Sequence, residues 1–104
     1  MGVSTVSDEA LLAGLATGDR ETAAAFVRRF QSRVFGLAAA ILSDPKAAED
    51  VAQETFVRAW RHAGTYDARR GAVSSWLLTI ARNLALDHAR LRRARATLEP
   101  PTSS

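Results

Sequence analysis

Apolar residues recur at intervals of three and four positions along most of this chain, which is the spacing of amphipathic helices. Runs that alternate β-branched and polar residues, the pattern typical of strands, are almost absent. The sequence therefore predicts an all-α fold, a compact bundle of about four helices.

Capping residues predict the bounds of the first two helices. A short helix over about residues 8–17 can be capped by Ser7 or Asp8 and ended by Gly18. Asp19 can cap a second helix over about residues 20–42. The second helix repeats apolar residues at helical period, at Ala23, Val27, Phe30, Val34, Leu37, Ala38 and Ile41.

The two remaining helices flank an irregular segment. Asp44 followed by Pro45 is a strong start signal for a third helix, which should end at Arg61 or His62. The period breaks in HAGTYDARRG, so we expect a loop of about ten residues there. A fourth helix is expected to begin near Ser74, which can cap it, and to run to about residue 95. Its predicted apolar side holds Trp76, Leu77, Ile80, Leu84 and Leu91.

The third helix has an apolar side and a compact polar face. The predicted core side holds Ala48, Val51, Ala52, Thr55, Phe56 and Ala59. The polar face holds Asp50, Gln53, Glu54 and Arg61, with Val57 among them. Exposed charges add little to stability, so folding does not require these residues. The pattern alone leaves open whether this face is only solvated or binds a partner.

The fourth helix has a polar face that suits nucleic acid. That face holds Thr79, Arg82, Asn83, Leu86, Arg90 and Arg93. Guanidinium, amide and hydroxyl groups can grip phosphates and read base edges. The alternative is a solvated helix whose cations lie near its C-terminal end, where the macrodipole favours them. Asp87 is expected to pair with Arg90 three residues later.

The charges are distributed unevenly along the chain. Residues 1–57 hold five basic and eight acidic side chains, whereas residues 58–104 hold nine basic and three acidic ones. The two parts should therefore meet different partners, and the basic part suits a polyanion. Arg69 and Arg70 add to it from the loop, where Tyr66 is either a core anchor or a surface for stacking.

Several functional classes lack the residues that they need. The sequence has no cysteine, no Gly-rich phosphate loop and no nucleophile motif, and His62 and His88 lack metal-ligand spacing. We expect no catalysis, no metal and no cofactor. The first residues lack a secretory pattern, and the apolar run 36–42 is far shorter than the ~20 residues of a membrane span, so a soluble cytoplasmic protein is expected.

Three stretches together resemble a known family. AEDVAQETFVRAW at 48–60, SWLLTIARNLALDHAR at 75–90 and the earlier AAFVRRFQSRVFGLAAAILSD at 24–44 resemble domain 2 of bacterial extracytoplasmic-function sigma factors. The resemblance covers about residues 8–95. It implies a flexible N-terminus at 1–7 and the start of an interdomain linker at 96–104, where EPPTSS cannot continue a helix. The resemblance also implies a domain that reads the −35 element beyond the linker, which we expect residues 1–104 to lack.

The resemblance implies a subunit that joins core RNA polymerase and directs it to promoters. The polar face of the third helix, Asp50, Gln53, Glu54 and Arg61, would dock on the clamp helices of the largest polymerase subunit. The loop and fourth helix would recognise the −10 element on the non-template strand, with residues 66–74 forming a pocket for a base turned out of the stack. The expected DNA contacts are Tyr66, Arg69, Arg70, Ser74, Thr79, Arg82, Asn83, Leu86, Arg90 and Arg93. GAVSSW at 71–76 lacks an aromatic residue that many relatives carry before the tryptophan. An anti-sigma factor is a further expected partner.

Two rival functions follow from the same helical pattern. A repressor of duplex DNA would insert a recognition helix into the major groove and would prefer double-stranded sites. A protein-interaction bundle with an incidental basic tail would show no DNA binding that depends on Asn83.

Overall fold

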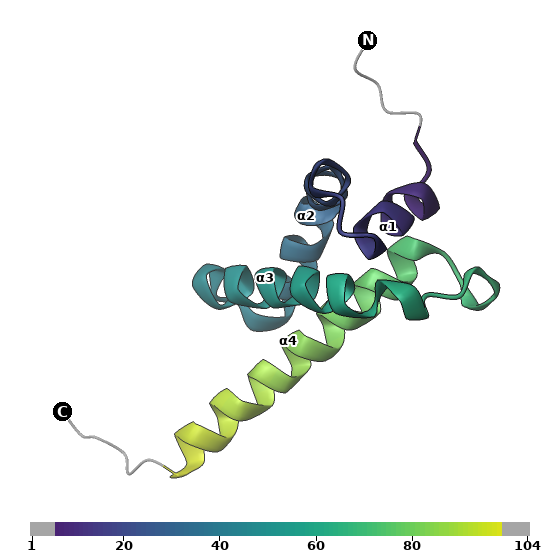
Figure 1. Ribbon diagram of the computed structural model, residues 1–104. Helices are drawn as coiled ribbons and strands as arrows, with labels where there is room; N and C mark the ends of the chain where they lie inside the picture. The colour runs from purple at the N-terminus through teal and green to yellow at the C-terminus, as the bar shows by residue number, and fades with distance from the viewer. Residues whose placement is uncertain (1–5, 99–104) are drawn as a thin grey trace.

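The computed structural model describes residues 6–98, and these residues form four α-helices and two short 3-10 turns. In chain order the elements are α1 (Asp8–Ala16), α2 (Arg20–Leu42), α3 (Pro45–His62), η1 (Ala63–Thr65), η2 (Ala68–Arg70) and α4 (Val73–Leu98). The predicted all-α bundle is confirmed. In Figure 1, α4 runs diagonally behind α3, and its C-terminal part extends beyond the other helices.

Side-chain caps set the predicted helix starts. The hydroxyl of Ser7 accepts a hydrogen bond from the Ala10 amide at 3.0 Å, and the carboxylate of Asp19 accepts one from the Thr22 amide at 3.2 Å. The Asp44 carboxylate accepts from the amides of Lys46 and Ala47, directly around Pro45 in the first turn of α3. These bonds satisfy amides that would otherwise lack partners within each helix. The sharp turn between α2 and α3 is made by Ser43, whose φ of 55° is left-handed.

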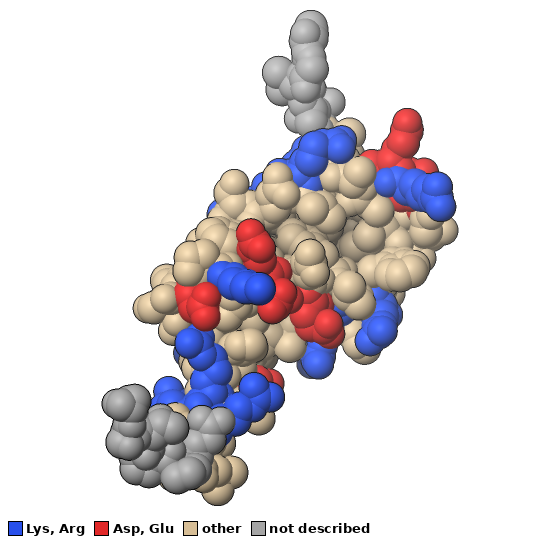
Figure 2. Space-filling model, turned by 90° about the vertical axis from the view of Figure 1, so that its left-hand side faces the viewer, with Lys and Arg blue, Asp and Glu red and all other residues tan. Residues whose placement is uncertain are grey.

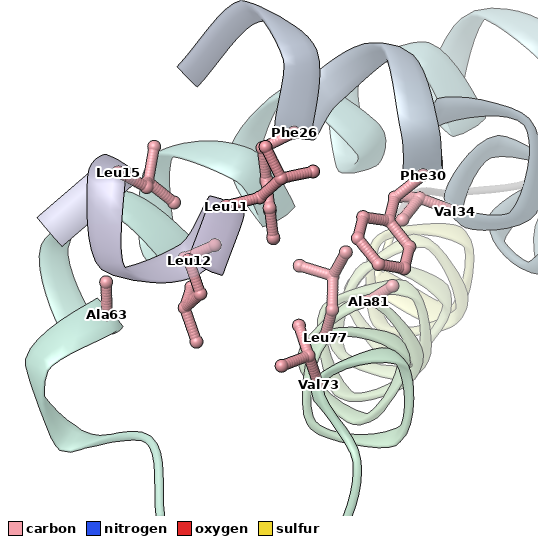
Figure 3. Close-up of a cluster of buried hydrophobic side chains, with 11 residues drawn as sticks. Leu11, Leu12, Leu15, Phe26, Phe30, Val34, Ala63, Val73, Leu77 and Ala81 are labelled. Atoms are coloured by element: carbon pink, nitrogen blue, oxygen red, sulfur yellow. The ribbon is translucent and has the colours of Figure 1, made fainter. Parts of the chain in front are cut away.

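The core lies where α1, α2 and α4 meet (Figure 3). Its largest fully buried side chains are Phe26, Phe30, Val34, Thr55, Val73 and Leu77. Three leucines of α1 close one end of this cluster, and Ala63 joins them from the turn after α3. The only polar member of the buried set in the described chain, Thr55, donates its hydroxyl to the Val51 carbonyl at 2.7 Å, so its burial leaves no donor unpaired.

Alanines line the contacts of α4 with its neighbours. Ala81 and Ala85 of α4, Ala48 and Ala59 of α3 and Ala38 of α2 are all fully buried. Small side chains let helix axes approach closely, so this contact holds the three long helices at fixed positions.

The structure corrects parts of the predicted core. Leu91 was expected on the apolar side of α4, but 59% of its surface is exposed, because the buried stripe ends at Ala85 and α4 then leaves the bundle. Phe26, which the predicted repeat of α2 omitted, is fully buried. Val27, Ala52 and Phe56 are only half-buried, since they border a groove between α2 and α3.

The bounds of α4 also differ from the prediction. The helix begins at Val73, and the Trp76 amide bonds to the Ala72 carbonyl, so Ser74 lies inside the first turn and does not cap the helix. At the other end α4 continues to Leu98, which places residues 96–98 of the expected linker in the helix. Residues 99–104 and 1–5 lie outside the described residues, whereas Val6 and Ser7 of the expected flexible N-terminus contact Arg29 and cap α1.

Replacing two helical glycines by alanine should change the free energy of unfolding in opposite directions. A Cβ on Gly14 of α1 would lie 2.3 Å from Cγ2 and 2.7 Å from Cβ of Thr22, so α1 and α2 would have to shift. A Cβ on Gly36 of α2 would meet nothing within 4 Å. Gly36→Ala should raise the free energy of unfolding by about 0.5–1 kcal/mol through helix propensity. Gly14→Ala should lower it, since overpacking costs about 1–3 kcal/mol. Urea denaturation followed by circular dichroism measures both, and stabilisation by Gly14→Ala would contradict this packing of α1.

Candidate functional site

Local hydrogen bonds hold the segment between α3 and α4 in a defined shape. The Tyr66 hydroxyl donates to the Gly71 carbonyl at 2.7 Å and so closes the segment on itself. The Tyr66 ring contacts Trp76 of α4 edge to face, with ring centroids 5.7 Å apart. Gly71 has a φ of 142°, a conformation that side chains rarely adopt, where the chain turns into α4. The two aromatic rings therefore stand side by side at the beginning of α4.

Charge interactions fix the second turn of this segment. The Asp67 carboxylate accepts hydrogen bonds from the guanidinium and the amide of Arg69, which hold the pKa of Asp67 below its usual value. This stabilisation is present above the usual aspartate pKa of about 3.9 and is lost as the pH falls through the lowered value. Desolvation, with smaller effects of the nearby carboxylates of Glu9, Asp67 and Asp8, raises the pKa of Tyr66.

A cavity of about 430 Å³ lies between this segment and the first turns of α4. We call it the loop cavity. It is lined by Thr65, Tyr66, Asp67, Arg70, Gly71, Ala72, Ser75, Trp76, Thr79 and Ile80. Aromatic rings, hydroxyls and one guanidinium group together can enclose a flat polar ring such as a nucleobase.

Only some of the predicted loop residues line the loop cavity. Tyr66, Arg70 and Thr79 do, as expected for DNA contacts, but Ser74 is half-buried beside it and Arg69 is engaged by Asp67. Sequence reasoning missed Ser75 and Thr65 and assigned Trp76 to the core alone. Ser75 lies in the first turn of α4 because the helix begins at Val73. The assumed cap at Ser74 would have started the helix one residue later.

Beyond the loop cavity, α4 separates two grooves. The α3-side groove, of about 220 Å³, is lined by Asn83 together with Arg58, His62, Trp76, Ile80, Leu84 and Asp87. The α2-side groove, of about 480 Å³, is lined by Arg82 together with Arg33, Leu37, Ser75, Leu78 and Thr79. Asn83 and Arg82, neighbours in sequence, therefore face different surroundings.

The outer part of the predicted DNA face of α4 is less uniform than the helical period suggested. Arg90 forms the expected ion pair with Asp87, so part of its charge is compensated. Leu86 is half-buried rather than exposed, whereas Arg93 is exposed on the part of α4 that leaves the bundle. Basic side chains gather toward that end of the molecule in Figure 2, while acidic ones gather over the body of the bundle.

All four residues of the predicted polar face of α3 are exposed, at Asp50, Gln53, Glu54 and Arg61. They border different hollows. Gln53 lines an apolar groove of about 400 Å³ between α2 and α3, beside Val27, Phe35 and Phe56. Asp50 and Glu54 line a hollow toward α4, where Glu54 pairs with Arg58 at 3.4 Å.

Sequence reasoning placed Val57 on this surface but missed Trp60. Trp60 is 59% exposed and Val57 is 37% exposed, and the two lie one turn apart on α3. Exposed tryptophans are a frequent anchor of protein interfaces. The signal was present in the sequence, because Trp60 falls outside the core stripe through Val51, Thr55 and Ala59.

Among residues 6–98, no helix is long and apolar enough to cross a membrane. Within the same residues, no three histidine, aspartate or glutamate side chains lie close enough together to hold a metal ion.

Comparison with known proteins identifies the family. Residues 26–96 match the Sigma-70 region 2 family. The chain belongs to this family.

Relatives of this region 2 chain are sigma factors of the extracytoplasmic-function group. It is 39% identical over 95 residues to the ECF RNA polymerase sigma factor SigK of Mycolicibacterium vanbaalenii, covering 91% of this chain and 48% of the relative. It is 40% identical over 85 residues to SigK of Mycobacterium ulcerans, covering 82% of this chain and 46% of the relative. The chain thus spans about half the length of the curated relatives it matches.

A solved structure of the same region has the same fold. An engineered region 2 of sigmaE, determined by NMR in complex with GTAAAA, superposes with a TM-score of 0.79 at 28% identity. The superposition covers 94% of this chain and 99% of that one. The predicted resemblance is confirmed for both the fold and the family.

The bond from Tyr66 to Gly71 should control the order of the region 2 loop. Tyr66→Phe keeps the ring contact with Trp76 but removes the hydroxyl donor, and we expect the amides of Arg70 and Gly71 to exchange faster with solvent. The loss of unfolding free energy should be about 0.5–1.5 kcal/mol or less. Hydrogen exchange followed by NMR measures this, with Thr65→Val as the control that removes a hydroxyl bonded to His62 outside the closure. Equal exchange in Tyr66→Phe and the unmodified chain would show that the bond does not hold the loop.

Proposed function

We propose that this region 2 binds core RNA polymerase through α3 and recognises the −10 promoter element, as a single strand, through the loop cavity and α4. The observation that carries the proposal is the loop cavity itself, with Tyr66 and Trp76 in contact and Arg70 on its wall. The family to which the chain belongs and the DNA named with its structural neighbour support it.

The loop cavity provides what an unstacked base needs. A base leaving the duplex loses stacking worth a few kcal/mol, which aromatic contact and hydrogen bonds to the base edge must replace. Trp76 and Tyr66 offer ring surfaces, and Thr79 and Ser75 offer hydroxyls on the next turn of α4. The Thr79 hydroxyl already donates to the Ser75 carbonyl at 2.8 Å, so its oxygen remains able to accept a hydrogen bond from a base.

The position of α4 favours a single strand over a duplex. Residues 73–85 carry the buried stripe of α4 and pack against α2 and α3, so α2 and α3 flank the part of this helix that remains open to a ligand. A single strand needs only a surface, along which its bases can be turned individually. This distinguishes the proposed function from that of a duplex repressor.

The surface of α3 suits a protein partner. Asp50 and Glu54 repel a polyanion, and the exposed Trp60 and Val57 supply apolar area next to them. Together with the apolar groove beside Gln53, they form a mixed surface of the kind that docks on another helix pair. We assign the clamp helices of the largest polymerase subunit to this face. An anti-sigma factor that covered either surface would block the function, which is non-enzymatic and belongs in the cytoplasm with the chromosome.

Asn83 should determine which base the chain prefers in a DNA strand, whereas Arg93 should attract every DNA strand regardless of its sequence. Asn83 lines the α3-side groove next to Trp76, whereas Arg93 is exposed far along α4. We expect Asn83→Ala to weaken binding strongly for some bases and weakly for others, at a cost of about 1–3 kcal/mol at the base it reads. Arg93→Ala should weaken all strands alike and reduce the salt dependence. Fluorescence anisotropy on GTAAAA and strands that change it one base at a time measures both, and equal losses on every strand for Asn83→Ala would contradict base reading.

Docking on polymerase should depend on the exposed face of α3. Asp50→Ala combined with Gln53→Ala should leave the helical content and melting temperature nearly unchanged, because both side chains are exposed. The double variant should bind core RNA polymerase at least tenfold more weakly in a co-purification or anisotropy assay. Glu21→Ala, an exposed acidic position at the start of α2, is the matched control and should bind normally. Unchanged polymerase binding by the double variant would rule out this face as the dock.

A further inference from the structure

The α2-side groove brings together two arginines that lie in oppositely charged parts of the sequence. Arg33 comes from α2, in the part of the sequence where acidic residues predominate, and Arg82 comes from α4. Both are exposed, and neither forms an ion pair with an acidic residue of the described chain. Arg29, Arg58, Arg69, Arg90 and Arg92, by contrast, each pair with a carboxylate.

The position of Arg33 is fixed by its own helix. Its guanidinium carbon lies 4.8 Å from the centroid of the Phe30 ring, and Phe30 is fully buried. A planar guanidinium that rests on an aromatic ring keeps its edge free for hydrogen bonds. Arg33 is therefore oriented before any ligand arrives, which reduces the entropy lost when it binds an anion.

In the part of the chain that the structure describes, no acidic residue lines the α2-side groove. The sequence of α2 holds no Asp or Glu after Glu21, and α4 holds none before Asp87. The α3-side groove differs, since Asp87 lines it and Asp50 and Glu54 line the hollow beside it. A polyanion that leaves the loop cavity therefore meets carboxylates toward α3 but only cations and uncharged groups toward α2.

The α2-side groove is continuous with the loop cavity. Ser75 and Thr79 line both of them, so the two hollows meet across one turn of α4. Basic grooves of single-strand binders follow the DNA backbone, so a strand with one base in the loop cavity brings its next phosphates to this groove.

We propose that Arg33 and Arg82 form a phosphate clamp in the α2-side groove that binds the DNA backbone next to the base held in the loop cavity. The clamp extends the nucleic-acid surface from α4 onto α2. It rests on the proposed function, because it takes the strand to be the ligand of the loop cavity. It makes α2 a DNA-binding helix as well as a part of the core.

The test measures the affinity of the full chain for fluorescein-labelled single strands of twelve nucleotides, one with GTAAAA at its centre and one with that sequence scrambled. Arg33→Gln should weaken binding to both strands by about three- to tenfold, as one lost charge-assisted phosphate contact requires. The magnitude of the slope of log affinity against log salt should fall by about 0.7 for each phosphate contact that is lost. Arg82→Gln should behave alike, and Arg33→Lys should restore most of the slope because it restores the charge.

Arg28→Gln is the matched control, since Arg28 is an exposed arginine of α2 that lines neither the loop cavity nor the α2-side groove. It should change affinity less than twofold. If Arg33→Gln and Arg28→Gln reduce affinity and salt slope equally, the clamp is refuted, while loss of binding in Tyr66→Ala would still support the loop cavity. If the unmodified chain binds neither strand, the proposed function itself fails. Melting temperatures of all variants show whether a loss comes from unfolding.

Discussion

The close contact of α4 with α2 and α3 is the constraint on which the rest of the structure depends. Ala81 and Ala85 are fully buried between the other helices, and Leu77 and Val73 continue the same stripe into the main core. Because this packing fixes one side of α4, it also fixes the directions in which the other side chains of residues 73–85 point. The loop cavity, the α2-side groove and the α3-side groove are each lined in part by α4 residues that flank this stripe. A larger residue at Ala81 or Ala85 would therefore disturb the loop cavity and both grooves.

Local sequence signals predicted the elements well because capping acts over three or four residues. Ser7, Asp19 and the Asp44–Pro45 pair each begin the helix that they were expected to begin. Ser74 failed as a cap because Val73 is fully buried, and its burial places the first turn of α4 one residue earlier. Leu91 was wrongly expected to be buried because the buried stripe of α4 ends at Ala85, beyond which no other helix of the described chain covers it. Periodicity shows which residues share a face but not where the neighbouring helices end.

The candidate site could be predicted only as far as it lies on single helices. The polar face of α3 and most of the α4 face follow from the period of one helix, and their residues are exposed where that period places them. The loop cavity combines the 63–72 segment with the first turns of α4, and the α2-side groove joins helices separated by about forty residues of sequence. Such sites depend on tertiary packing. The charge count therefore assigned Arg33 to the half of the sequence with an acidic excess, although Arg33 lines the same groove as Arg82 and Thr79.

The same packing separates two binding surfaces by charge, with carboxylates on and beside α3 and free arginines along the α2 side of α4. In the proposed function, polymerase on α3 and a DNA strand in the loop cavity and the α2-side groove would therefore occupy different surfaces. An NMR titration of the labelled chain with single-stranded GTAAAA tests this most directly. We predict that amide signals of residues 65–83 and of Arg33 shift with added DNA, while those of Asp50, Gln53 and Val57 do not move. Shifts confined to α3 or to the projecting end of α4, with the loop cavity unaffected, would contradict this arrangement of the two surfaces.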